Sequence, residues 1–275
     1  MNAQAESRVP PRDPEPPTGD ADVTARMAGA SPQRWARVAG GLYLINIVGG
    51  FFAEGYVPAA LVVSGDAAAT ARNILAHELI YRLGIVAHII VLLTNIPLAG
   101  IFYDLFKVVN RRLALLLVFF TLVGTAIEGV TLLAQFAPLI LLEGGHSLSV
   151  FHTDQLQALA NTSLDLQAIG FNITLVFFVG YDLSLGYLMF RSTFLPRFLG
   201  VLLAIGGLCY LTYSFTDFLA PGFAAQLVPY IQLPSGIGEL SLCLWLLVIG
   251  VNAQRWKQRA RAAGAPIHTE NGENA

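Results

Sequence analysis

Six long apolar stretches constrain the fold of this chain more than any other feature. Each approaches or exceeds the roughly 20 mostly apolar residues that a helix needs to cross a bilayer. Charged residues make up only 12% of the sequence, against about a quarter of an ordinary soluble domain. The sequence therefore predicts an all-α integral membrane bundle of six transmembrane helices, with Pro138 kinking or ending the third. The predicted spans are about residues 38–58, 83–106, 112–142, 166–189, 197–219 and 235–252.

The membrane domain, residues 34–256, is predicted to lie between two disordered tails. Residues 1–33 hold six of the fourteen prolines, mixed with charges and without apolar periodicity, which is typical of disorder. Residues 257–275 form the second predicted tail.

The basic residues are distributed unevenly over the connections. All Lys and Arg residues except Arg72 and Arg82 lie in the two ends of the chain or in the second and fourth connections. By the positive-inside rule, this predicts that both termini are cytoplasmic. Trp35 and Trp256 lie next to the first and last spans on the same side and are expected to be interfacial anchors.

Two outer connections are predicted to contain short amphipathic helices. The first follows Asp66, a residue type that caps helix N-termini, and the second follows Thr153, another possible cap. Both could be lids over the bundle or simple connectors, and connectors are the commoner case. Their apolar faces are Ala71, Ile74, Leu75 and Leu79 in the first, and Leu156, Leu159, Ala160 and Leu164 in the second.

Several ionisable residues fall inside the predicted spans, where an unpaired charge costs several kcal/mol. At ~1.5 Å per residue, Glu54 and Glu128 lie roughly 21 and 24 Å from the cytoplasmic side of their helices. His88 lies roughly 7 Å below the outer start of the second span, and Glu239 is similarly shallow in the sixth. We expect these groups in the outer part of the bilayer.

Polar residues also share helix faces with these groups. Asn46 shares a face with Glu54, Asn95 shares one with His88, and Gln135 shares one with Glu128. Such stripes face other helices rather than lipid, which predicts a polar interior that opens outward. The candidate proton or solute site comprises Glu54, His88, Glu128, Glu239, Asn46 and Asn95. The alternative is that these groups hydrogen-bond one another and only fix helix register.

Three further acidic residues are given separate interpretations. Asp217, at the outer end of the fifth span, is expected to be solvated, and Asp104 is expected to form a surface ion pair with Lys107. Asp182 could face a cytoplasmic vestibule or pair with Arg191, and the sequence favours neither.

The sequence argues against several other functions. The net charge of −2 supplies no basic excess for nucleic acid. His88, His146 and His152 lack the spacing of a helical zinc site, so no metal is predicted. No phosphate-binding loop, dinucleotide-binding motif or nucleophile elbow is present, so no cofactor or catalytic residue is assigned.

Several stretches resemble a bacterial family of multi-pass membrane proteins, domain of unknown function 4386. They are ARVAGGLYLI (36–45), GDAAATARNILA (65–76), RLGI (82–85), TDQLQALA (153–160), FLPRFLGVLLAIGGLCYL (194–211) and GELSLCLWLLVIG (238–250). The resemblance runs from about residue 36 to 252 and supports six membrane helices. It implies a bacterial cytoplasmic membrane, places Glu239 and the Gly65–Asp66 turn within the family pattern, and supplies no activity.

The sequence thus predicts a membrane protein that transports or binds a small solute or ion, with proton coupling as one form. One alternative is an intramembrane enzyme that uses a carboxylate and His88 as acid and base. A third is a non-catalytic membrane protein whose surface helices dock another protein. The lipid bilayer is the only partner that the sequence identifies.

Overall fold

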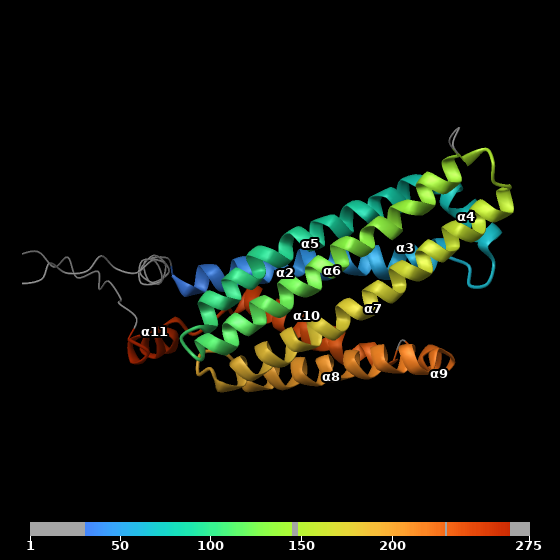
Figure 1. Ribbon diagram of the computed structural model, residues 1–275. Coiled ribbons are helices and arrows are strands. Elements are labelled where there is room, and N and C mark those ends of the chain that lie inside the picture. The colour runs from blue at the N-terminus through green and yellow to red at the C-terminus, as the bar shows by residue number, and fades with distance from the viewer. Residues whose placement is uncertain (1–30, 145–147, 229, 265–275) are drawn as a thin grey trace, which may run out of the picture.

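A computed structural model describes residues 31–144, 148–228 and 230–264, and it is helical throughout, with no strand among these residues (Figure 1). The predicted tail up to residue 30, His146, and residues 265–275 lie outside the described residues. Six helical segments are long and apolar enough to cross a membrane, which confirms the all-α, six-helix prediction. They are α2 (Pro32–Gly50) with a π-helical turn (Phe51–Tyr56) and α3 (Val57–Leu61), then α5 (Glu78–Phe106), α6 (Arg111–Glu143), α7 (Thr153–Arg191), α8 (Arg197–Leu219), and α10 (Leu233–Val248), which follows a short 3-10 turn (Tyr230–Gln232).

The outward surface of the bundle is apolar, as a lipid-facing surface must be. Leu133 of α6 and Val248 of α10 are 72% and 71% exposed. Large contiguous patches of this kind are rare on soluble monomers. The exposed side chains thus mark the surface that contacts the bilayer.

The six segments form a closed ring. Each helix packs against its two neighbours in the order α2, α5, α6, α7, α8 and α10, and α10 returns to α2. Gly186 of α7 permits one of the closest approaches, because a Cβ atom there would lie 2.6 Å from the Gly200 carbonyl oxygen of α8. Small residues at such crossings let helix backbones touch within a membrane.

The start of α2 and the last helix, α11 (Ala253–Ala262), lie at the same end of the bundle (Figure 1). We call this the inner end and the opposite one the outer end. Lys107 and Asp104 form the predicted ion pair at the inner end, with 2.7 Å between Nζ and Oδ1. Trp256 does not lie at the bundle surface as expected, since it is buried and its indole N–H donates to the Leu105 carbonyl at 3.0 Å.

α11 also changes the predicted tail boundary. Residues 257–262 belong to this helix, although the sequence places them in a disordered tail. Asn252 caps it by accepting a hydrogen bond from the Arg255 amide at 3.0 Å. The anchored Trp256 side chain gives the short helix a fixed attachment that a charged sequence alone does not suggest.

One predicted outer helix is present but shorter than predicted, since Leu79 of its expected apolar face belongs to α5. α4 (Ala67–Ala76) begins after Asp66, whose Oδ1 accepts from the Ala69 amide at 2.8 Å. A further short helix, α9 (Pro221–Leu227), lies between α8 and α10 and was not predicted.

The second predicted outer helix is wrong as a separate element. Its residues form the first turns of α7, a single helix of 39 residues. The N-cap is His152, whose amide donates to the Gln155 side chain at 2.9 Å, and not Thr153. Of the two effects expected of Pro138, a kink or an end of the third span, the end is not observed, because α6 continues to Glu143.

Candidate functional site

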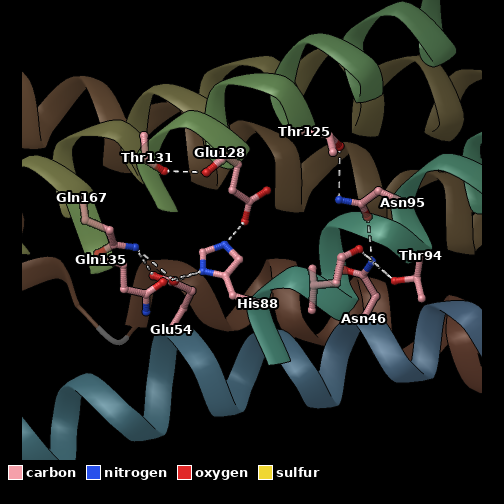
Figure 2. Close-up of polar contacts among 11 residues, drawn as sticks. Asn46, Glu54, His88, Thr94, Asn95, Thr125, Glu128, Thr131, Gln135 and Gln167 are labelled. Carbon is pink, nitrogen blue, oxygen red and sulfur yellow. Dashed lines mark hydrogen bonds and ion pairs between the residues drawn. The ribbon is translucent and has the colours of Figure 1, made fainter. Parts of the chain in front are cut away.

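Two carboxylates hold the imidazole of His88 on α5 from opposite sides. Nε2 lies 2.7 Å from Glu128 Oε1 on α6, and Nδ1 lies 2.9 Å from Glu54 Oε1 on the first span. The His88 side chain is only 1% exposed, and Glu128 is 5% exposed. Figure 2 shows the imidazole between the two acids. Three of the predicted candidate residues, from three helices, therefore meet at one point.

Glu54 reaches this point from the π-helical turn Phe51–Tyr56. Pro58 explains the turn, because it has no amide hydrogen to donate to the Glu54 carbonyl in an α-helix. The Val57 amide instead bonds to the Phe52 carbonyl, five residues back. Single π-helical turns are rare and frequently occur at functional sites. This one sets the rotation of Glu54 relative to the rest of its span.

Two glutamines complete the contacts of the triad, which we define as Glu54, His88 and Glu128. Gln135 of α6 places its amide oxygen 3.2 Å from His88 Nδ1, and Gln167 of α7 donates to both Glu54 oxygens at 3.1 Å (Figure 2). Both glutamines are buried. A helical-phase argument finds Gln135, which shares the face of Glu128, but Gln167 lies on α7, for which no polar stripe was predicted.

The hydrogen-bonding chemistry of the triad leaves one proton to be shared. Oxygens of an ionised Glu54 and of the Gln135 amide only accept, so His88 Nδ1 carries the hydrogen. One further hydrogen lies between Nε2 and Glu128. When it is bonded to the ring, an imidazolium faces a carboxylate, and when it is bonded to Glu128, a neutral imidazole faces a carboxylic acid. A second proton would neutralise the remaining carboxylate charge. The site can therefore hold protons in more than one arrangement without moving its heavy atoms.

A layer of amides adjoins the triad on its inner side. Asn46 of α2 donates to the side-chain oxygens of Asn95 and Thr94 on α5, at 2.6 and 3.2 Å. Asn95 in turn donates to Thr125 Oγ1 of α6 at 3.3 Å (Figure 2). The structure thus brings the two predicted asparagines together, and they link the same three helices as the triad.

Glu239 does not join the triad. It lies on α10, where the Tyr210 hydroxyl of α8 donates to it at 3.2 Å, and it interacts electrostatically with Asp182 of α7. Tyr43 and Tyr181 also interact electrostatically with these two acids. Asp182 is 4% exposed, so it is buried within the bundle rather than open to a vestibule. The proximity of Asp182 and Glu239 could not be predicted from the sequence, because it depends on which helices are neighbours in the ring.

Asp217 is also less solvated than expected. It is half-buried at the outer end of α8, and the Asn172 amide of α7 donates to its Oδ2 at 2.7 Å. The bond joins α7 and α8 near their outer ends. Asp217 therefore has a helix-pairing contact that its position at a span end did not suggest.

His88 lies deeper in its helix than predicted, and the outer end above the triad is closed. α5 begins at Glu78 rather than at residue 83, whereas α6 has almost the predicted bounds, with Glu128 near its middle. An apolar cluster covers the outer side of the triad and includes Ile74 of α4, which is 0% exposed. The expected outward-opening interior is thus wrong for this conformation. The outer cluster comprises Val57, Leu61, Ile74, Tyr81, Ile85, Leu132 and Leu139.

The donor set of the triad fits protons better than metals. Across the residues that the structure describes, no group of three or more His, Cys, Asp and Glu side chains has an arrangement that could hold a metal ion. Both ring nitrogens of His88 already contact carboxylates. A groove lies elsewhere, on the lipid-facing side of α8 and α10.

Comparison with known proteins gives a family and no activity. The family model described as "Domain of unknown function (DUF4386)" matches residues 38–250. No curated protein and no solved structure matches the chain.

Proposed function

The chain belongs to the family of domain of unknown function 4386, and we propose that it is a proton-coupled transporter of a small solute or ion. In this proposal Glu54, His88 and Glu128 hold the coupling proton. The observation that carries it is the buried imidazole of His88 with a carboxylate on each ring nitrogen. Buried ionisable residues in a membrane are costly and typically mark ion or proton pathways.

The charge balance supports a proton as the ligand of the triad. With His88 protonated and both acids ionised, the triad carries one net negative charge in an apolar bundle. Its contacts with Gln135 and Gln167 are to neutral amides, so they do not cancel that charge. One added proton neutralises the triad, and its release restores the charge. Such a change in charge can bias a helix bundle between two arrangements.

The surroundings of the triad support an occluded state of a transport cycle. Apolar clusters lie on both sides of it along the bundle, and α4 contributes Ile74 to the outer one. Glu54, at 17% side-chain exposure, is the least buried member. We therefore propose that Glu54 exchanges the coupling proton with the outer side and that Glu128 stores this proton.

The geometry of the triad fits an acid–base enzyme less well than it fits a proton-coupled transporter. His88 contacts both carboxylates, so acid and base do converge. A substrate would have to displace one of them, because each ring nitrogen is engaged and apolar side chains pack above and below. A proton requires no such displacement.

The basic residues at the inner end support a cytoplasmic location for both termini. Exposed arginines, among them Arg34, Arg112 and Arg197, gather at the end where α2 begins and α11 lies. By the positive-inside rule, we propose that both termini are cytoplasmic in a bacterial cytoplasmic membrane. Proteolysis of sealed, right-side-out membranes tests this, because a C-terminal tag should be protected until the membranes are opened.

Reconstituted vesicles test the transport proposal. The full chain is placed in vesicles with an internal pH dye, and an imposed membrane potential drives protons inward. Glu128→Gln and His88→Gln should reduce protein-dependent acidification to the rate of protein-free vesicles. Glu143→Gln is the matched control, because Glu143 is an exposed carboxylate of the same helix that pairs with Arg82. Wild-type vesicles with no flux under a potential or a pH gradient would contradict the proposal, as would full flux through Glu128→Gln.

A further inference from the structure

An open groove runs between α8 and α10 close to the inner end. Its volume is about 370 Å³, and Leu199, which is fully buried, contributes to its lining. Phe198 and Trp245 also line it, with ring centroids 5.9 Å apart and planes at 82°. Val248 lines it while remaining 71% exposed. The lining is mostly apolar, as a lipid chain would require.

Two arginines flank the inner end of this groove. Arg197 directly precedes Phe198 at the start of α8. Arg255 of α11 donates from Nη1 to the Thr193 carbonyl at 3.2 Å, which places it beside the connection that leads into α8. The Asn252 amide donates to the Phe194 carbonyl at 3.0 Å and fastens the two connections together. Both arginines are exposed, and Arg197 lies over the Phe190 ring of α7, with 5.5 Å between Cζ and the ring centroid, so a ligand would bind the remaining donors of the two guanidinium groups.

Among the described residues of α11 and of the two connections near the groove, every charged side chain is basic. Residues 190–200 and 240–264, which form both connections and α11, contain no Asp or Glu. Asp104 of α5, an acid at the inner end, is paired with Lys107. The basic residues of the two segments are Arg191, Arg197, Arg255, Lys257, Arg259 and Arg261.

We propose that this groove binds one anionic phospholipid, with an acyl chain against Phe198, Trp245 and Val248 and the phosphate at Arg197 and Arg255. Guanidinium groups bind phosphate oxygens through charge-assisted, often bidentate hydrogen bonds. Basic pockets between membrane helices on the cytoplasmic side are a recurring form of anionic lipid site. A free phosphate would use the arginines but not the groove. The combination of the two therefore selects a lipid.

The phosphate contact has a second consequence for the fold. Arg197 belongs to α8 and Arg255 to α11, so one headgroup would bridge two elements. The lipid is thus expected to hold α11 against the bundle. This adds to the anchor that Trp256 makes with the Leu105 carbonyl.

Native mass spectrometry of the full-length protein tests the proposal. The probes are dioleoyl phosphatidylglycerol and dioleoyl phosphatidylcholine, added separately at equal ratios to delipidated protein in detergent. The wild type should retain phosphatidylglycerol in preference. Each basic residue near an anionic surface contributes about a fivefold factor in affinity. Arg197→Gln combined with Arg255→Gln should therefore weaken phosphatidylglycerol binding about 25-fold.

Two further variants keep the test specific. Arg112→Gln removes an exposed arginine of α6 at the same end of the bundle and should leave binding within about twofold of wild type. Ser241→Phe fills the groove from its lining and should also weaken binding while all cations remain. Folding of each variant is checked by circular dichroism and gel filtration.

Three outcomes would overturn the proposal. They are equal retention of both lipids by the wild type, unchanged phosphatidylglycerol binding by the double arginine variant, and an equal loss in Arg112→Gln. A competition experiment with a soluble phosphate completes the test. Glycerol phosphate should fail to displace the lipid, and displacement would show that the arginines bind phosphate without the groove.

Discussion

His88 Nε2 lies 2.7 Å from Glu128 Oε1 in a part of the bundle where neither side chain reaches solvent. Glu54 engages the other ring nitrogen, at 2.9 Å, so the imidazole connects a carboxylate near the outer cluster to one near the middle of α6. A proton that moves between the acids needs only a change of hydrogen positions on the ring.

Pro58→Ala should disturb the triad without touching any of its members. The new amide can donate to the Glu54 carbonyl, which removes the reason for the π-helical turn. Conversion to an α-helix would rotate Glu54 by about 100° relative to His88. We expect proton flux in vesicles to fall about 100-fold or more, the scale of a lost acid–base contribution.

Pro97→Ala is the control for this variant. Pro97 lies in α5, which remains α-helical around it, and its side chain is exposed. Flux should stay near the wild-type rate. Equal losses in the two variants would mean that the π-helical turn has no special role.

Asn46→Leu should destabilise the contact between α2 and α5. The change removes the donor that serves Asn95 and Thr94, and hydrogen bonds between membrane helices contribute about 0.6 kcal/mol on average and at most about 1.7. We expect the free energy of unfolding to fall by about 1–2 kcal/mol. Detergent-induced unfolding followed by circular dichroism measures it. Asn161→Leu, which removes an exposed contact with Asp165 within α7, should change it by less than about 0.5 kcal/mol.

Gly186→Ala should weaken the crossing of α7 and α8. The added methyl group would meet the Gly200 carbonyl oxygen at 2.6 Å. This oxygen belongs to the backbone, so it cannot move away by a change of side-chain rotamer. Overpacking of this kind costs about 1–3 kcal/mol. The same unfolding assay applies. Gly41→Ala is the matched control, because no atom lies within 4 Å of the added carbon there, and it should be as stable as the wild type.

The sequence predicted the helices of this fold better than the contacts between them. The fifth span, 197–219, has the bounds of α8, because Pro196 and Arg197 mark its start and Asp217 its end. The 39-residue α7 was divided in two, because Asn161, Asp165 and Gln167 interrupt its apolar pattern. Polar side chains that pair with another helix look the same in sequence as those of a surface connector.

The candidate site was predictable where one helix face carried the signal. Stripes on three spans identified Glu54, His88 and Glu128, and the structure brings them together. Glu239 was grouped with them because it has a similar depth, yet it lies beside Asp182 and Tyr210. Depth can be read from a sequence, but the order of helices around the ring cannot.

The proton held between His88 and Glu128 is the centre of this account, and infrared difference spectroscopy measures it most directly. The reconstituted wild type is titrated across the pH range in which it stays folded, and the carbonyl band of protonated carboxylic acid is followed. We expect a titrating band that is absent in Glu128→Gln and retained in Glu143→Gln. A wild-type band that survives unchanged in Glu128→Gln would contradict the account.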